Sequence, residues 1–114
     1  MDKKSIQLRY KLILLKPKQA DINDLSNVIG FKPENGISKP VFGLLSDQKY
    51  LVAYRSQKTQ TGEILIPVGL IAFQINGKKL STINTIVHKD FRAQGIATRM
   101  NLHLWGIARN NGYA

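Results

Sequence analysis

The stretch that decides the fold is residues 86–100, which reads IVHKDFRAQGIATRM. A β-branched run closes at Val87, a short polar connection follows, and a helix opens at Gly95. This order is typical of an anion site, because the first N–H groups of a helix have no intrahelical partner and the helix dipole adds positive charge there. Ala97 adds little side-chain bulk, and Arg92 supplies a charged fork suited to phosphate oxygens. The stretch therefore predicts recognition of a phosphorylated cofactor.

The run from Val87 to Ala97 resembles the signature of the GNAT N-acetyltransferases, approximately V-x-P-x-Y/F-R-G-x-G-I/V-G/A. Lys89 stands where that family usually has proline, and Ala93 stands where it usually has the first glycine. Residues 14–22, LLKPKQADI, also resemble the usual start of such domains, in which a first strand runs into a first helix. The resemblance implies an α+β fold with α/β/α layers, in which a mostly antiparallel, twisted sheet carries helices on both faces.

The resemblance also implies an activity, the transfer of an acetyl group from acetyl-CoA to a primary amine on a small molecule or a peptide. Acetyl-CoA is then the co-substrate, and no metal is expected. The strand end is expected to meet the acetyl and pantetheine groups, and the following loop to meet the pyrophosphate. The cofactor-binding residues expected on this basis are Ile86, Val87, Arg92, Ala93, Gln94, Gly95, Ile96, Ala97 and Thr98.

The sequence assigns no catalytic residue. In the family a tyrosine that protonates the thiolate usually lies on the fourth helix, which would come after Ala114. The expected fourth strand contains no carboxylate, although Asn84 or Thr85 could hold a water that relays a proton. His88 stands beside the expected site, but it occupies a strand-exit position that varies in the family. Asp90 is expected to cap or brace the turn.

The remaining chemistry-bearing side chains favour structural roles. His88 and His103 are far apart in sequence and do not make a metal site. We expect His103 to be a surface or packing residue and Met100 to lie in the core. The aromatic residues expected in the core or at its rim are Tyr10, Tyr50, Tyr54 and Trp105.

Composition limits the class of protein. A chain of 114 residues with 43% hydrophobic and 21% charged residues is typical of one folded domain. The absence of cysteine excludes disulfides, thiolate metal sites and cysteine nucleophiles. The apolar run Leu12–Leu15 is too short to span a membrane, and no signal-peptide core precedes it. We therefore expect a cytoplasmic protein without a membrane partner.

The formal net charge of +10 leaves a nucleic-acid partner open. Residues 78–114 carry six of the 17 basic residues against Asp90 alone. A basic rim of this kind attracts an anionic cofactor or an RNA-bearing substrate. No clustered basic and aromatic residues of a nucleic-acid module are recognisable. A basic RNA-directed acetyltransferase or RNA-binding module is therefore kept as an alternative that rests on charge.

Periodicity and turn residues predict the elements. The expected strands are 6–15, which Pro17 ends, and 50–55, 64–75 and 80–87. A hairpin loop is expected over 57–63, and Asn76-Gly77 predicts a type I′ turn.

Two helices are also expected. Asp21 is expected to cap the first, whose apolar face is Ile22, Leu25, Val28 and Ile29 and which Gly30 closes. A loop over 32–36 follows, and 37–45 is either irregular or a short helix. The second helix spans 95–110 and ends at Asn111-Gly112, with an apolar stripe of Ile96, Met100, Leu104 and Ile107.

The resemblance covers the N-terminal two-thirds of the family's fold and ends before its usual fifth strand. Residues 1–114 are therefore interpreted as a single, truncated GNAT-like domain. An uncovered fourth-strand edge would be a template for pairing, so a homodimer or completion by a partner strand is expected. The alternative to an enzyme is a non-catalytic CoA-binding or structural remnant of such a domain.

Overall fold

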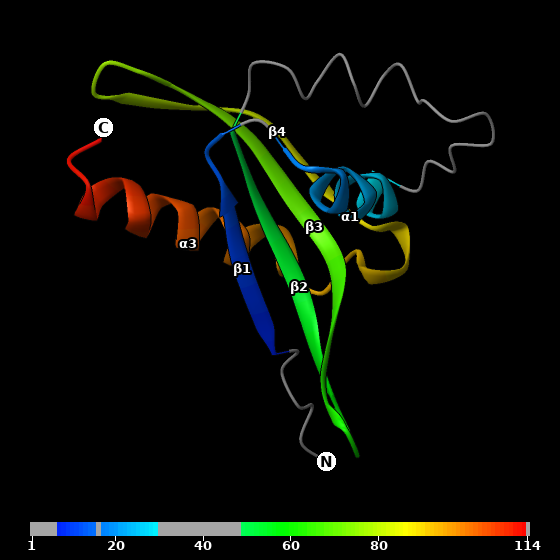
Figure 1. Cartoon of the computed structure of the whole chain (residues 1–114). Coiled ribbons are helices and arrows are strands. Elements are labelled where there is room, and N and C mark those ends of the chain that lie inside the picture. Colours follow the sequence, from blue (N-terminus) through cyan, green and yellow to red (C-terminus); the bar gives the residue numbers. More distant parts are fainter. Residues whose placement is uncertain (1–6, 16, 30–48, 114) are drawn as a thin grey trace.

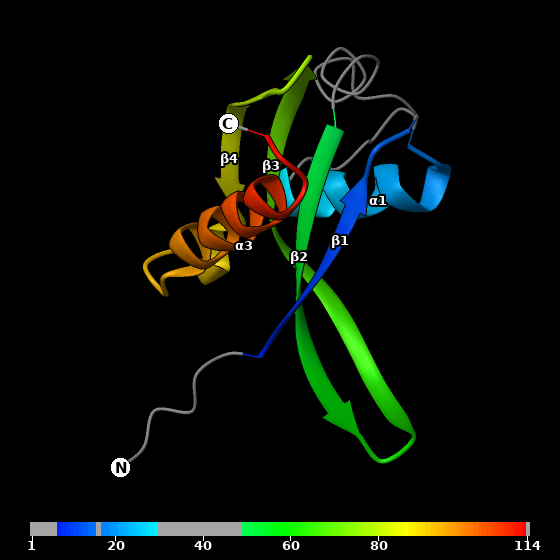
Figure 2. The ribbon, with the colours of Figure 1, turned by 90° about the vertical axis from the view of Figure 1, so that its left-hand side faces the viewer.

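The computed structural model describes residues 7–15, 17–29 and 49–113, and within these residues the chain forms one antiparallel sheet with order β1-β2-β3-β4. The strands are β1 (Leu8–Ile13), β2 (Lys49–Thr59), β3 (Gly62–Asn76) and β4 (Lys79–Val87). The helical segments are α1 (Gln19–Ile29), the short 3-10 turn η1 (Lys89–Phe91) and α3 (Ile96–Asn110). The two long helices cover opposite faces of the sheet (Figures 1 and 2). This arrangement confirms the expected α+β fold.

The face under α3 carries one of two apolar clusters. The buried residues of α3 recur every four positions, which places them on one side of the helix: Ile96, Met100, Leu104 and Ala108. They pack against sheet residues that include Leu51, Ile71 and Phe73, each at most 1% exposed. Ile107, which the sequence placed in this stripe, is only partly buried, and Ala108 takes the core position.

The face under α1 carries the second cluster. Leu25 and Val28 of α1 are 1% and 2% exposed and pack over Tyr50, Val52 and Leu70. The side chains of successive strand residues point to opposite faces, so the same strands supply both clusters. Ile22 is partly buried against this cluster, as expected from the helical spacing.

The hairpin between β2 and β3 differs from the expected loop over 57–63. The pairing continues to Thr59 opposite Gly62, so only Gln60 and Thr61 turn the chain. The outer part of this hairpin extends beyond the helices (Figure 2). A strand pair that no helix covers carries polar side chains on both faces without losing its backbone ladder, and the polar sequence therefore suggested a loop.

The turn between β3 and β4 lies near the expected position but has another type. Asn76 pairs with Lys79, so Gly77 and Lys78 are the central residues of the turn. Gly77 has φ +62°, whereas Lys78 does not have a positive φ. A positive φ at the first central residue alone fits a type II′ turn, and the predicted type I′ turn is wrong.

The first strand and helix also differ from the prediction at their ends. Strand β1 ends at Ile13, before Pro17. Helix α1 begins at Gln19, so Asp21 lies within its first turn, where its carboxylate accepts a bond from the backbone N–H of Lys18. The predictions for Gly30, the loop 32–36 and the segment 37–45 lie outside the described residues.

Candidate cofactor site

The connection from β4 to α3 is built from local backbone and side-chain bonds. The backbone N–H of Phe91 donates to the carbonyl of His88 at 2.8 Å, which closes the turn η1. The N–H of Asp90 donates to Nδ1 of His88 at 3.1 Å. The ring of His88, and not the side chain of Asp90, therefore caps the turn; the Asp90 carboxylate lies 3.8 Å from the same nitrogen, beyond hydrogen-bond distance.

The last residue of β4 presents its backbone away from the sheet. The N–H of His88 donates to the carbonyl of Val68 at 2.8 Å, and Val87 pairs opposite Gly69. In an antiparallel ladder this pattern turns the N–H and C=O of Val87 outward. Consistently, the outward carbonyl of Val87 accepts a bond from Nε of Arg92 at 3.1 Å. This bond does not use the terminal amino groups of the Arg92 guanidinium.

Two residues with positive φ turn the chain into α3. Ala93 has φ +63° and is the only non-glycine with positive φ in the described part of the chain. Gly95 has φ +76° and forms the N-cap of α3 without a side-chain cap. A left-handed conformation costs an L-residue about 1–2 kcal/mol, which explains why glycine is favoured at such positions. Ala93 therefore carries strain where the family pattern has glycine.

The N-terminus of α3 presents backbone donors. The first intrahelical bond runs from the N–H of Arg99 to the carbonyl of Gly95 at 3.1 Å. The N–H groups of Ile96, Ala97 and Thr98 precede this bond and point beyond the helix end. The side chain of Ile96 is 2% exposed and anchors this end in the core. The first turn contains no acidic residue that would compete for these donors.

An arginine from another strand lies against the same connection. The guanidinium carbon of Arg55, on β2, lies 5.7 Å from the centre of the Phe91 ring, a cation–π distance. The ring of His88 also meets Phe91 edge to face at 5.7 Å. Sequence reasoning missed Arg55, because only the tertiary pairing of β2 with β3 brings it near this loop.

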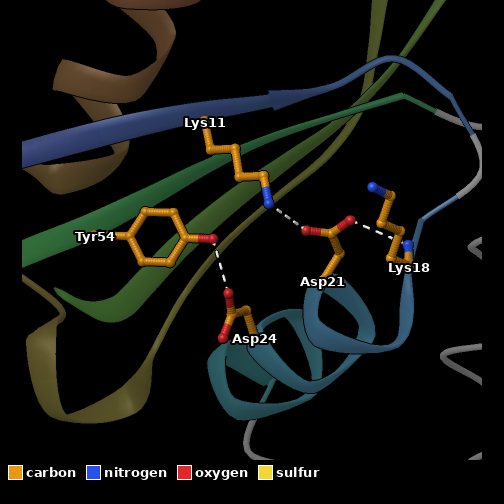
Figure 3. Close-up of polar contacts among 5 residues, drawn as sticks. All are labelled: Lys11, Lys18, Asp21, Asp24 and Tyr54. Atoms are coloured by element: carbon orange, nitrogen blue, oxygen red, sulfur yellow. Dashed lines mark hydrogen bonds and ion pairs between the residues drawn. The ribbon is translucent and has the colours of Figure 1, made fainter.

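Polar contacts join α1 to the face of the sheet that lies away from α3 (Figure 3). Lys11 on β1 donates to Asp21 at 2.6 Å, and this bond, helped by the N–H of Lys18, holds the pKa of the Asp21 carboxyl below its usual range. The hydroxyl of Tyr54 donates to Asp24 at 2.9 Å. Burial, followed by this bond to a carboxylate, raises the pKa of Tyr54.

The other aromatic residues mostly lie where the sequence placed them. Tyr50 and Tyr54 are 2% and 7% exposed, and burial raises the pKa of Tyr50 to about 12. Tyr10 stacks on His103 with ring centres 3.9 Å apart, so His103 is a packing residue at the surface. Trp105 is 43% exposed and lies at the rim.

The described residues contain neither a metal-binding group nor a membrane-spanning helix. No group of three or more His, Cys, Asp or Glu side chains gathers there in a way that would hold a metal ion. None of the described helices has both the length and the hydropathy needed to cross a membrane.

By sequence, the chain matches no protein-family model and no curated protein. Solved structures do match its fold. It is similar to the ribosomal-protein-S18-alanine N-acetyltransferase from Escherichia coli, with TM-score 0.59 and 15% identity, over 93% of this chain and 63% of that one. It is also similar to an IAA acetyltransferase from Bacillus cereus, with TM-score 0.57 and 14% identity, over 95% of this chain and 62% of that one.

A third similar structure is a GNAT family acetyltransferase from Staphylococcus aureus, with TM-score 0.58 and 14% identity, over 93% of this chain and 81% of that one. The described strands and helices therefore have the fold of the GNAT acetyltransferases. The chain spans less than two-thirds of the length of the first two structures.

Proposed function

We propose that this chain binds acetyl-CoA and transfers its acetyl group to an amine. The observation that carries the proposal is the arrangement around the β4–α3 connection. The helix N-terminus presents the N–H groups of Ile96, Ala97 and Thr98, and the preceding strand presents the outward N–H of Val87. Donors of both kinds are what a pyrophosphate and a thioester carbonyl require from one protein surface.

The pyrophosphate is proposed to lie on the N-terminus of α3. The left-handed turn at Ala93 and Gly95 aims the backbone of the loop at this position, and an added Cβ at Gly95 would meet nothing within 4 Å. The terminal amino groups of Arg92 add positive charge at the entrance. Gln94 is exposed on the same loop and completes the proposed cradle.

The acyl group is proposed to lie at the outer edge of β4. The outward N–H of Val87 is proposed to donate to the carbonyl oxygen, and such a bond strengthens as negative charge develops during attack by the amine. Nε of Arg92 donates to the carbonyl of the same residue, Val87, which fixes the orientation of the backbone at the end of β4. Ile86 points to the α1 side of the sheet and Val87 to the α3 side, so the two line the site from both faces.

Proton removal from the amine is proposed to use a water. Asn84 pairs with Ala72, whose side chain lies under α1, so Asn84 stands on that same face. Thr85 pairs with Ile71 and stands on the α3 face. The described part of β4 contains no carboxylate, so a water held by one of these polar groups is proposed to relay the amine proton to solvent, while the C–S bond breaks and the CoA thiolate leaves and takes a proton from solvent.

An assay of acetyl transfer tests the proposal. The chain would be incubated with acetyl-CoA and a panel of primary amines and basic peptides, and the acetylated product would be detected by mass spectrometry. We expect transfer to at least one acceptor, with a rate at least tenfold lower in Arg92→Ala. Lys78→Ala, which removes the same charge from the β3–β4 turn, is the matched control and should change the rate less than twofold. Cofactor binding without transfer to any acceptor would favour the non-catalytic alternative.

A further inference from the structure

Asp24 differs from the other acidic side chains in the part of the chain that the structure describes. Asp21 pairs with Lys11, Glu63 with Arg9, and Asp90 lies against the ring of His88. Asp24 forms no ion pair among these residues, although the chain has 17 basic residues and a net charge of +10. Within the described part of the chain, its one side-chain hydrogen bond is donated by the hydroxyl of Tyr54 at 2.9 Å.

The Tyr54 bond fixes the Asp24 carboxylate over the sheet. Tyr54 is 7% exposed and packs in the apolar cluster under α1, so its hydroxyl has little freedom (Figure 3). Asp24 itself is only partly buried. A carboxylate that is held beside an apolar surface and lacks a cation accepts hydrogen bonds only, so its natural complement is an ammonium or guanidinium group.

The sheet register relates this carboxylate to the proposed acyl site. Tyr54 lies opposite Pro67 on β3, and the neighbouring Val68 accepts the N–H of His88 at the end of β4. Two strand spacings, about 10 Å, therefore separate the backbone of Tyr54 from the backbone at the end of β4. Helix α1, which carries Asp24, contacts both β3 and β4.

The Asp24 carboxylate is held by the side chain of a β2 residue, whereas the proposed acyl site lies at the outer edge of β4, two strands away in the sheet. This placement suits a second group on the same acceptor. We propose that Asp24 is a specificity residue that binds a distal cationic group of the acceptor. The substrate class is then a linear di- or polyamine, whose neutral terminal amine reaches the acyl site while another nitrogen, protonated, pairs with Asp24. This inference rests on the proposed acetyl transfer.

Titration of the whole chain with spermidine, without cofactor, tests the inference. Hexan-1-ol, a linear chain without a positive charge, is the comparison ligand. We expect spermidine to bind more tightly than hexan-1-ol, and Asp24→Asn to weaken spermidine binding at least tenfold without affecting hexan-1-ol. Glu63→Gln removes the same charge on the distant hairpin and should change spermidine binding less than twofold. Tyr54→Phe leaves the Asp24 carboxylate in place but removes the hydrogen bond that orients it. This variant should weaken spermidine binding two- to fivefold.

Equal spermidine binding by the wild type and Asp24→Asn, both shown to be folded by circular dichroism, would overturn the inference. Asp24 would then have only a structural role, as the partner of Tyr54 between α1 and the sheet. If Asp24→Asn does not fold, unchanged spermidine binding in Tyr54→Phe would overturn it in the same way. Acetyl transfer to amines that does not depend on Asp24 would overturn this inference but leave the proposed function standing. Asp24-dependent spermidine binding without any acetyl-CoA binding would support the cation site and overturn the proposed function.

Discussion

Substitution of Gly95 by alanine isolates the backbone geometry at the start of α3. An added Cβ meets no atom within 4 Å at this position, so the effect of the substitution comes from φ +76° and not from a steric clash. The left-handed conformation costs alanine about 1–2 kcal/mol. Alanine also restricts the unfolded chain, which offsets about 0.4–1 kcal/mol of that cost. We therefore expect Gly95→Ala to lower the free energy of unfolding by about 0.5–1 kcal/mol.

Gly106→Ala is the matched control, because an added Cβ is equally unobstructed there and Gly106 lies within α3 without a positive φ. Alanine is favoured over glycine inside a helix, so we expect this variant to raise the free energy of unfolding by about 0.5–1 kcal/mol. Urea unfolding followed by circular dichroism measures both variants. Stabilisation by both substitutions would refute the left-handed cap at Gly95 and with it the shape of the proposed cradle.

Three further perturbations test other parts of the structure. Ala93→Gly should stabilise the chain by up to about 1 kcal/mol in the same assay, because it relieves the strain at φ +63°. Gly69→Ala should cost about 1 kcal/mol, at the low end for overpacking, because the new Cβ would lie 2.7 Å from Cε of Met100, the far end of a side chain that can shift; Met100→Val should show a coupling of at least about 0.5 kcal/mol in a double-mutant cycle. Asp21→Asn should lower stability at neutral pH and converge with the wild type in acid. The folded pKa of Asp21 is depressed, so its contribution is complete above the unfolded value near 3.9 and is lost as pH falls through the folded value. A difference between these two proteins that persists unchanged at low pH would contradict the role of the Lys11 bond.

The core and the β4–α3 connection were predictable from the sequence because local patterns determine them. A helical spacing of four identifies Ile96, Met100 and Leu104, and the β-branched run that ends at Val87 identifies the last strand. The length of the β2–β3 hairpin was not predictable in this way. Its outer end, residues 57–63, contains only polar residues and one glycine, so strand and loop have the same composition there.

The polar contacts of the site depend on tertiary structure and escaped sequence reasoning. Asp24 and Tyr54 are 30 residues apart and meet only because α1 packs on the face of the sheet that carries the Tyr54 side chain. Arg92 was expected to serve phosphate alone, but its Nε also holds the carbonyl of Val87. A single sequence shows neither contact, because neither follows from a helical or strand period.

The expected pairing of the fourth-strand edge stays a prediction. Among the described strands, β4 has β3 as its one neighbour, and its residues 81–87 carry no charge. Such an edge is a template for another strand. Sedimentation of the chain should show a dimer or larger species, and a strictly monomeric chain would count against the prediction.

Calorimetric titration of the chain with acetyl-CoA tests the central claim most directly. The account predicts saturable binding in the micromolar range that weakens at least tenfold in Arg92→Ala and less than twofold in Lys78→Ala. Absence of saturable binding by the folded wild-type chain, or equal affinity in the wild type and Arg92→Ala, would contradict the assignment of the β4–α3 connection as a cofactor site.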